Sequence, residues 1–97
     1  MRITPEQALK QLRTGAVLVD VRTCEEYKAG HIPDAKNLPL DELGDAAWLL
    51  PDQTASVIVY CASGARSARA AAMLAAAGYT HVFDLGAITA WPYEVCR

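Results

Sequence analysis

The residues best suited to chemistry lie in one run, VIVYCASGARS, from Val57 to Ser67. A strand-like aliphatic segment ends at Cys61, and a glycine-centred loop then leads into an alanine-rich segment typical of a helix. This order places Cys61 at the carboxyl end of a strand and beneath a helix N-terminus. Backbone N–H groups from Ala62 to Ser67 can converge there, and together with the helix dipole they favour an anion. We therefore predict an acidic, nucleophilic thiol at Cys61.

The loop after Cys61 offers groups that could bind a substrate anion. Gly64 permits backbone angles that residues with side chains resist. Arg66 can present a planar fork of donors to an oxyanion, and Ser63 and Ser67 add hydroxyls for a thiolate or a substrate oxygen. The candidate substrate-binding set is Ala62, Ser63, Gly64, Ala65, Arg66 and Ser67.

No proton-transferring residue lies in this loop. Acyl-transfer cysteine enzymes need a positioned histidine base, whereas a thiolate formed by backbone dipoles can attack a sulfur atom unaided. Displacement at divalent sulfur depends on the thiolate fraction and on the acidity of the leaving group. A sulfane sulfur with an anionic leaving group is therefore the fitting substrate, and the expected product is a persulfide on Cys61.

The rest of the chain predicts helices and strands in alternation, which is typical of an α/β domain with a mostly parallel sheet. Ligands of such domains lie beyond the carboxyl ends of the strands, where Asp20 and Cys61 both fall. Thr23 with Glu26 three residues later predicts a capping box at the start of the helix over 24–29. We also expect Trp48 to pack from its helix into the core. The predicted elements are a residue or two of edge strand, a helix from Pro5 to Gly15, a strand over 16–21, a helix over 24–29, a strand over 38–40, a helix over 41–50, a strand over 57–60, a helix over 66–77, a strand over 82–85 and a helical turn over 86–91.

Composition narrows the class of protein. Ninety-seven residues that are 53% hydrophobic suit one domain over residues 1–97. A formal charge of -2 without clustered Lys and Arg disfavours a nucleic-acid or anionic-membrane surface. Three cysteines without C-x-x-C spacing disfavour a disulfide framework and a zinc site, and the polar N-terminus disfavours a signal peptide. We expect a cytoplasmic monomer with no metal, no cofactor, no nucleic-acid partner and no membrane contact.

Three segments resemble one family over essentially the entire chain. They are VLVDVRTCEEYKAGHIPDAKNLPL, VIVYCASGARSARAAAMLAAAGY and VFDLGAITAW. The strand end D-V-R, the pair E-E-Y and G-H-I-P, and the loop C-x-x-G-x-R-S resemble the single-domain rhodaneses, the thiosulfate sulfurtransferases. One departure is Gly86 followed by Ala87, where the family usually has two glycines.

This resemblance implies a rhodanese-like three-layer domain, with a five-stranded sheet that carries helices on both faces. It implies that Cys61 takes a sulfane sulfur from a donor such as thiosulfate and passes it to cyanide, a thiol or a thiol protein. Asp20 and Arg22 would support the site indirectly by ordering neighbouring loops, and we expect a local salt bridge or turn hydrogen bond between them. The related cell-cycle phosphatases and arsenate reductases use a loop one residue longer, so four residues between Cys61 and Arg66 favour sulfur transfer.

Two alternatives remain at this stage: a persulfide carrier or regulatory module for a protein partner, and a phosphatase or arsenate reductase.

Other residues have less specific interpretations. We expect His31 to be a structural turn residue, and Arg69 to be solvated while adding positive potential. Cys24 and Cys96 could act as resolving thiols if the fold brings them near Cys61. For the aromatic residues Trp91 and Tyr93, a pocket wall and ordinary packing are equally good predictions.

Overall fold

A computed structural model describes residues 1–97. Its elements alternate between helix and strand as predicted. The predicted capping box of Thr23 and Glu26 is present, and Thr4, the N-cap of the first helix, forms a second capping box with Gln7. The longest helix has 12 residues, and none is long and apolar enough to cross a membrane. The elements are α1 (Pro5–Arg13), β1 (Val17–Asp20), α2 (Cys24–Ala29), β2 (Lys36–Asn37), η1 (Leu40–Asp45), α3 (Ala46–Leu49), β3 (Ser56–Cys61), α4 (Ala65–Ala76), β4 (His81–Ala87) and η2 (Ile88–Ala90).

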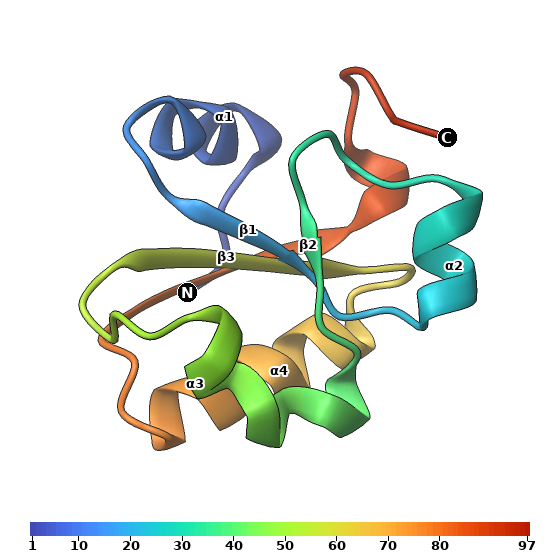
Figure 1. Ribbon diagram of the computed structural model, residues 1–97. Coiled ribbons are helices and arrows are strands. Elements are labelled where there is room, and N and C mark those ends of the chain that lie inside the picture. The colour runs from blue at the N-terminus through green and yellow to red at the C-terminus, as the bar shows by residue number, and fades with distance from the viewer.

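The four strands form one parallel sheet in the order β2-β1-β3-β4. Val19 of β1 pairs with Lys36 of β2 on one side and with Val59 of β3 on the other. β4 completes the sheet, and its last pair joins Cys61 to Ala87. In Figure 1, α1 lies on one side of the sheet and α3 and α4 lie on the other. The predicted α/β fold with helices on both faces is therefore confirmed.

The sheet has four strands rather than the expected five. The missing edge strand is reduced to a single bridge, in which Arg2 pairs with Asp84 of β4. The Ile3 amide donates to the Asp84 carbonyl at 3.0 Å. Helix α1 begins at Pro5, directly after its cap, so only the first three residues are left to pair with β4.

Each face of the sheet carries its own core, and alternate β3 residues contribute to each. Val57, Val59 and Cys61 belong to the cluster on the α4 side, and Ile58 and Tyr60 belong to the cluster on the α1 side. All five residues are fully buried. Because successive side chains of a strand point to opposite faces, this register directs the Cys61 thiol toward α4.

The segment after α2 differs from its predicted structure. The strand predicted over 38–40 lies two residues earlier, at β2, and Leu38 follows it as a buried residue. The helix predicted over 41–50 is divided into the 3-10 helix η1 and the single α-helical turn α3. Neither η1 nor α3 has a side-chain N-cap, and Gly44 is a weak helix former within the run.

Trp48 does not pack into the core as expected, because its residue is 90% exposed. Ala46 and Leu50 are the buried residues of this segment, at 5% and 4%. α3 is only four residues long, so its buried side leaves Trp48 on the solvent side. In a single turn, the direction of each side chain depends on where the turn docks, which apolar content alone does not determine.

Candidate active site

Cys61 is the last residue of β3, and its side chain lies under the first turn of α4. Gly64 makes the connecting turn with a φ of 101°, a left-handed value that residues with a Cβ rarely adopt, and α4 begins at Ala65. The Cys61 sulfur accepts hydrogen bonds from the Gly64 amide at 2.9 Å and the Ser67 amide at 3.3 Å. The predicted convergence of backbone donors on the sulfur is thus present.

These donors change the acidity of the thiol. Burial by itself raises the pKa of Cys61, since it disfavours the charged thiolate. Hydrogen bonds from the Ser67 and Gly64 amides favour the thiolate, and they outweigh burial, so the pKa lies below its ordinary value. An acidic cysteine follows from the local geometry, without a histidine base.

The serine side chains of the loop differ in position. The Ser67 hydroxyl donates to the Gly64 carbonyl at 3.0 Å, and this bond closes the turn on which the Gly64 amide depends. Ser67 is fully buried, whereas Ser63 is exposed. The Ser67 side chain therefore stabilises the loop rather than offering its proton to a substrate, while the Ser63 hydroxyl faces solvent.

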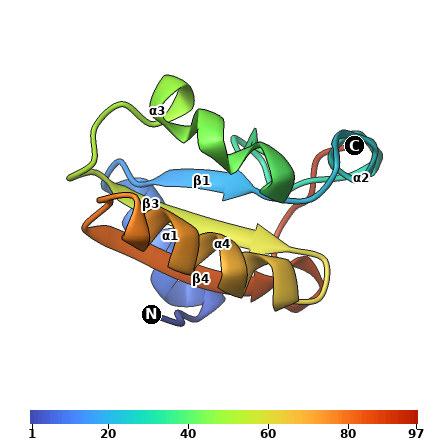
Figure 2. The same ribbon diagram turned by 90° about the horizontal axis from the view of Figure 1, so that it is seen from below.

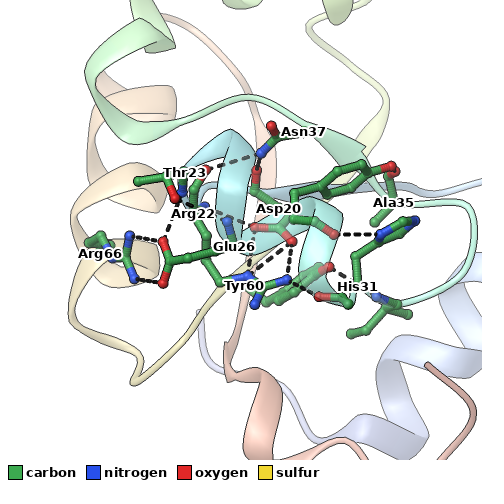
Figure 3. A network of polar contacts seen from close by, with 12 residues as sticks. Asp20, Arg22, Thr23, Glu26, His31, Ala35, Asn37, Tyr60 and Arg66 are labelled. Carbon is green, nitrogen blue, oxygen red and sulfur yellow. Dashed lines mark hydrogen bonds and ion pairs between the residues drawn. The ribbon is translucent and has the colours of Figure 1, made fainter. Parts of the chain in front are cut away.

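Arg66 makes a long-range interaction that no local sequence pattern indicates. Its two terminal nitrogens donate to the two carboxylate oxygens of Glu26, at 2.7 and 2.9 Å (Figure 3). The planar fork expected to hold an oxyanion is occupied by a carboxylate from α2. Hydrogen bonds from Arg66 lower the pKa of Glu26 to about 2, so this carboxylate is ionised at neutral pH.

The position of Glu26 follows from the start of α2. Thr23 is the N-cap, and its side chain accepts from the Glu26 amide at 3.2 Å. In return, Glu26 Oε1 accepts from the Thr23 amide at 2.9 Å. The capping box was predicted from the spacing of these two residues, but the same carboxylate also holds Arg66. The spacing of Glu26 from its cap signals the first role, and no local signal indicates the second.

Asp20 and Arg22 form a buried ion pair at the end of β1, as the sequence suggested. Arg22 Nη2 lies 2.7 Å from Asp20 Oδ2 and donates to the Gly30 carbonyl at 2.6 Å (Figure 3). The Arg22 guanidinium also lies 5.7 Å from the centre of the Tyr60 ring. The pair therefore joins the end of β1 to the end of α2 and to the residue that precedes Cys61.

A second arginine, Arg2, lies against the Cys61 loop from the other side. A Cβ at Gly86 would lie 2.6 Å from Arg2 Nη2, and one at Gly64 would lie 3.9 Å from Nη1. Gly86 can accept this close approach because it has no side chain, and its φ of 88° also favours glycine. Arg2 is exposed and forms no ion pair, so its charge is available to an anion.

A groove of about 460 Å³ opens between η1 and α4, and we call it the η1–α4 groove. It begins at Arg66, the residue that closes the Cys61 loop, and continues past Arg69 and Met73 along α4. Figure 2 shows η1 and the first turns of α4 near the end of the sheet to which the strands point. The groove therefore adjoins the edge at which parallel sheets place their ligands.

A family model described as a rhodanese-like domain matches residues 4–93. The chain belongs to this family. A thiosulfate sulfurtransferase, GlpE of Pseudomonas entomophila, is 38% identical over 91 residues, which are 93% of this chain and 83% of that protein. The rhodanese fold is shared with the human single-domain sulfurtransferase TSTD1, at 30% identity and a TM-score of 0.84, with 93% of each chain covered. A rhodanese with anions from E. coli gives a TM-score of 0.81 at 33% identity, covering 86% of this chain and 99% of that one.

The remaining candidate residues lie outside the Cys61 loop of this rhodanese domain. His31 stacks on Tyr27 with ring centres 3.8 Å apart, and its Nδ1 donates to the Tyr27 carbonyl at 2.8 Å, which is a structural role. Its backbone pairs with Cys96 near the C-terminus. Cys24 is exposed at the start of α2, and all three cysteines are free thiols.

The two candidate wall aromatics of the rhodanese domain, Trp91 and Tyr93, lie on the α1 side of the sheet. Trp91 packs against that core and meets Tyr93 edge to face, with ring centres 4.9 Å apart. Both line a shallow depression next to α1, together with Leu9 and Leu12. Since the Cys61 thiol faces α4, these rings do not line the η1–α4 groove, and ordinary packing is their role in the structure.

Proposed function

We propose that this rhodanese moves a sulfane sulfur from an anionic donor such as thiosulfate to a nucleophilic acceptor such as cyanide or a thiol, through a persulfide on Cys61. The observation that carries the proposal is the Cys61 sulfur itself, which accepts two backbone hydrogen bonds and has a lowered pKa. A similar protein with 38% identity is a thiosulfate sulfurtransferase. The short loop between Cys61 and Arg66 supports the same chemistry over phosphate hydrolysis.

In the first half-reaction, the Cys61 thiolate attacks the outer sulfur of thiosulfate. The sulfur–sulfur bond of the donor breaks, and its electron pair leaves with sulfite. In the second, the acceptor attacks the outer sulfur of the persulfide, and the electron pair of the broken bond returns to Cys61. The amides of Gly64 and Ser67 stabilise the thiolate that begins and ends the cycle.

The neighbouring residues have supporting roles in this proposal. The backbone of Ala62, Ser63 and Ala65 shapes the loop, and Arg66 is oriented by Glu26 rather than free to bind the donor. The unpaired guanidinium of Arg2 supplies positive potential beside the loop. The Asp20–Arg22 pair anchors the neighbouring strand end.

Incubation with thiosulfate and cyanide should release thiocyanate. Intact-mass measurement should show one added sulfur atom after thiosulfate, and cyanide should remove it. Cys61→Ser should abolish both signals, whereas the matched variants Cys24→Ser and Cys96→Ser should retain them. Full thiocyanate release by Cys61→Ser, or Cys61-dependent hydrolysis of an aryl phosphate without any persulfide, would contradict the proposal.

We further propose that residues 1–97 act as one domain and as a monomer in the cytoplasm, with a thiol protein as one class of acceptor. One continuous sheet with a core on each face supports the single domain. Three free cysteines suit a reducing compartment. Sedimentation equilibrium should give the mass of one chain, and a dimer would contradict this part of the proposal.

A further inference from the structure

The η1–α4 groove has a lining of mixed apolar and charged character. Its volume of about 460 Å³ lies in the range of small-molecule sites. Pro39, Leu40 and Met73, which are at least partly exposed, give it apolar surface, which suits the methylene groups of a small organic ligand. Thiosulfate and cyanide have no such groups, so neither of these substrates explains the apolar lining.

Two unpaired charges of opposite sign line the same groove. Arg69 of α4 and Asp41 of η1 are both exposed, and neither takes part in an ion pair or a side-chain hydrogen bond. The third charged residue, Arg66, already has the Glu26 carboxylate as its partner. The groove therefore offers one free cation and one free anion to a ligand.

The groove lies on the face of the sheet toward which Cys61 points. Val21 lines the groove and belongs with Cys61 to the core cluster under α4. Its amide also donates to the carbonyl of Tyr60, the residue before Cys61, at 3.1 Å. Arg66 lines the groove as well and closes the Cys61 loop. The groove therefore adjoins the Cys61 loop through Arg66, the one residue of that loop that lines it.

We infer that the η1–α4 groove binds the sulfur acceptor, and that this acceptor is a small thiol that carries both a carboxylate and an ammonium group. The inference rests on the proposed sulfur transfer and names one of its substrates. Arg69 pairs with the carboxylate, Asp41 pairs with the ammonium group, and the apolar lining contacts the carbon chain. The acceptor thiolate forms a bond to the outer sulfur of the Cys61 persulfide. The bond between the two persulfide sulfurs breaks, and its electron pair stays on Cys61 as a thiolate.

Four thiols with one carbon skeleton test this inference: cysteine, N-acetylcysteine, cysteinamide and N-acetylcysteinamide. Apart from the thiol group, they are respectively a zwitterion, an anion, a cation and a neutral molecule. The protein is first loaded with sulfur from thiosulfate and freed of excess donor, and loss of the persulfide is then followed by intact mass in a single turnover. Each variant is compared with the unmodified protein for each thiol, which cancels differences in intrinsic thiol reactivity.

Arg69→Gln should slow transfer to cysteine and N-acetylcysteine by about fivefold relative to the two thiols without a carboxylate, as expected for an exposed ion pair. Asp41→Asn should slow transfer to cysteine and cysteinamide by a similar factor relative to the two acetylated thiols. Arg13→Gln is the matched control, because this exposed arginine lies on α1 across the sheet. It should change none of the four relative rates.

Equal effects on all four thiols, or selectivity in only one of the two groove variants, would overturn the inference. A change in relative rates with Arg13→Gln would also overturn it, because net charge rather than the groove would then select the thiol. If the proposed sulfur transfer itself were wrong, the experiment would fail at the loading step, because the unmodified protein would take up no sulfur from thiosulfate. That result differs from a loaded protein that shows no selectivity among the four thiols.

Discussion

Both carboxylate oxygens of Glu26 accept hydrogen bonds from Arg66, although the two residues are 40 positions apart in the chain. This bidentate pair joins α2 to the first turn of α4, and therefore to the loop that surrounds the Cys61 sulfur (Figure 3). Because the Glu26 carboxylate is also part of the α2 capping box, the orientation of Arg66 depends on how α2 begins. Two consequences of this ion pair and three of the neighbouring contacts can be measured.

Glu26→Gln should reduce sulfur transfer. The amide retains one acceptor oxygen but loses the charge and the bidentate geometry, so Arg66 is held less firmly and the loop is less well ordered. We expect kcat/KM for thiosulfate to fall by about fivefold, the factor typical of a partly exposed ion pair. Glu25→Gln is the matched control, since Glu25 is an exposed neighbour on the same helix. An equal loss of activity in both variants would contradict a specific role for Glu26.

The same ion pair should contribute to the acid stability of the fold. The pKa of Glu26 is lowered from 4.5 to about 2, so its contribution is fully present above pH 4.5 and is lost as the pH falls to about 2. The free energy of unfolding should therefore decline less steeply with acid in Glu26→Gln than in the unmodified protein. Urea titrations at several pH values between 5 and 2 measure this, and parallel curves would contradict it.

Persulfide formation should follow the ionisation of Cys61. Since the pKa of this thiol is below its ordinary value, the rate of loading from thiosulfate should rise with pH and level off at a lower pH than for free cysteine. The rate should be lost as the pH falls through the pKa of Cys61, because only the thiolate attacks sulfur. A rate that keeps rising beyond the ionisation of free cysteine would show that the two amides do not acidify the thiol.

Arg2→Gln should weaken binding of an anionic donor. A Cβ at Gly64 would lie 3.9 Å from Arg2 Nη1, and the Gly64 amide nitrogen lies 2.9 Å from the Cys61 sulfur. With two intervening bonds of about 1.5 Å each, the cation lies within about 10 Å of that sulfur, close to the screening length at moderate salt. We expect KM for thiosulfate to rise by about threefold at low salt, with a smaller difference at high salt. Arg13→Gln removes the same charge from α1 and should leave KM unchanged. A similar rise in both variants would indicate a general charge effect.

Gly86→Ala should displace Arg2 by steric contact. The new Cβ would lie 2.6 Å from Arg2 Nη2, and the flexible end of this side chain can move away at little cost. The stability loss should then be mostly backbone strain at a φ of 88°, about 1–2 kcal/mol. Gly15→Ala, at a φ of 101° with open space around it, should cost a similar amount but leave KM for thiosulfate unchanged. Gly86→Ala without a rise in this KM would argue against a role for Arg2.

Local features of the chain determined much of the candidate site. Cys61 lies at the predicted strand end, and Gly64 makes the predicted turn, because the strand, loop and helix are consecutive in the sequence. The hydrogen bonds from Gly64 and Ser67 reach a sulfur only three and six residues away. The capping box of Thr23 and Glu26 could be predicted for the same reason, since it is a contact between residues three positions apart.

Only the tertiary structure decided what Glu26, Arg66 and Arg2 contact. Glu26 and Arg66 meet because α2 and α4 both begin at the carboxyl edge of the sheet, and Arg2 meets Gly86 because the N-terminus runs beside β4. Trp48 is exposed because the short turn of α3 docks with its other side inward. Hydrogen bonds within a turn are set by chain geometry, whereas these contacts depend on how separate elements pack. The sequence by itself therefore determined the acidic thiol, and packing decided which arginines remain free to meet its substrates.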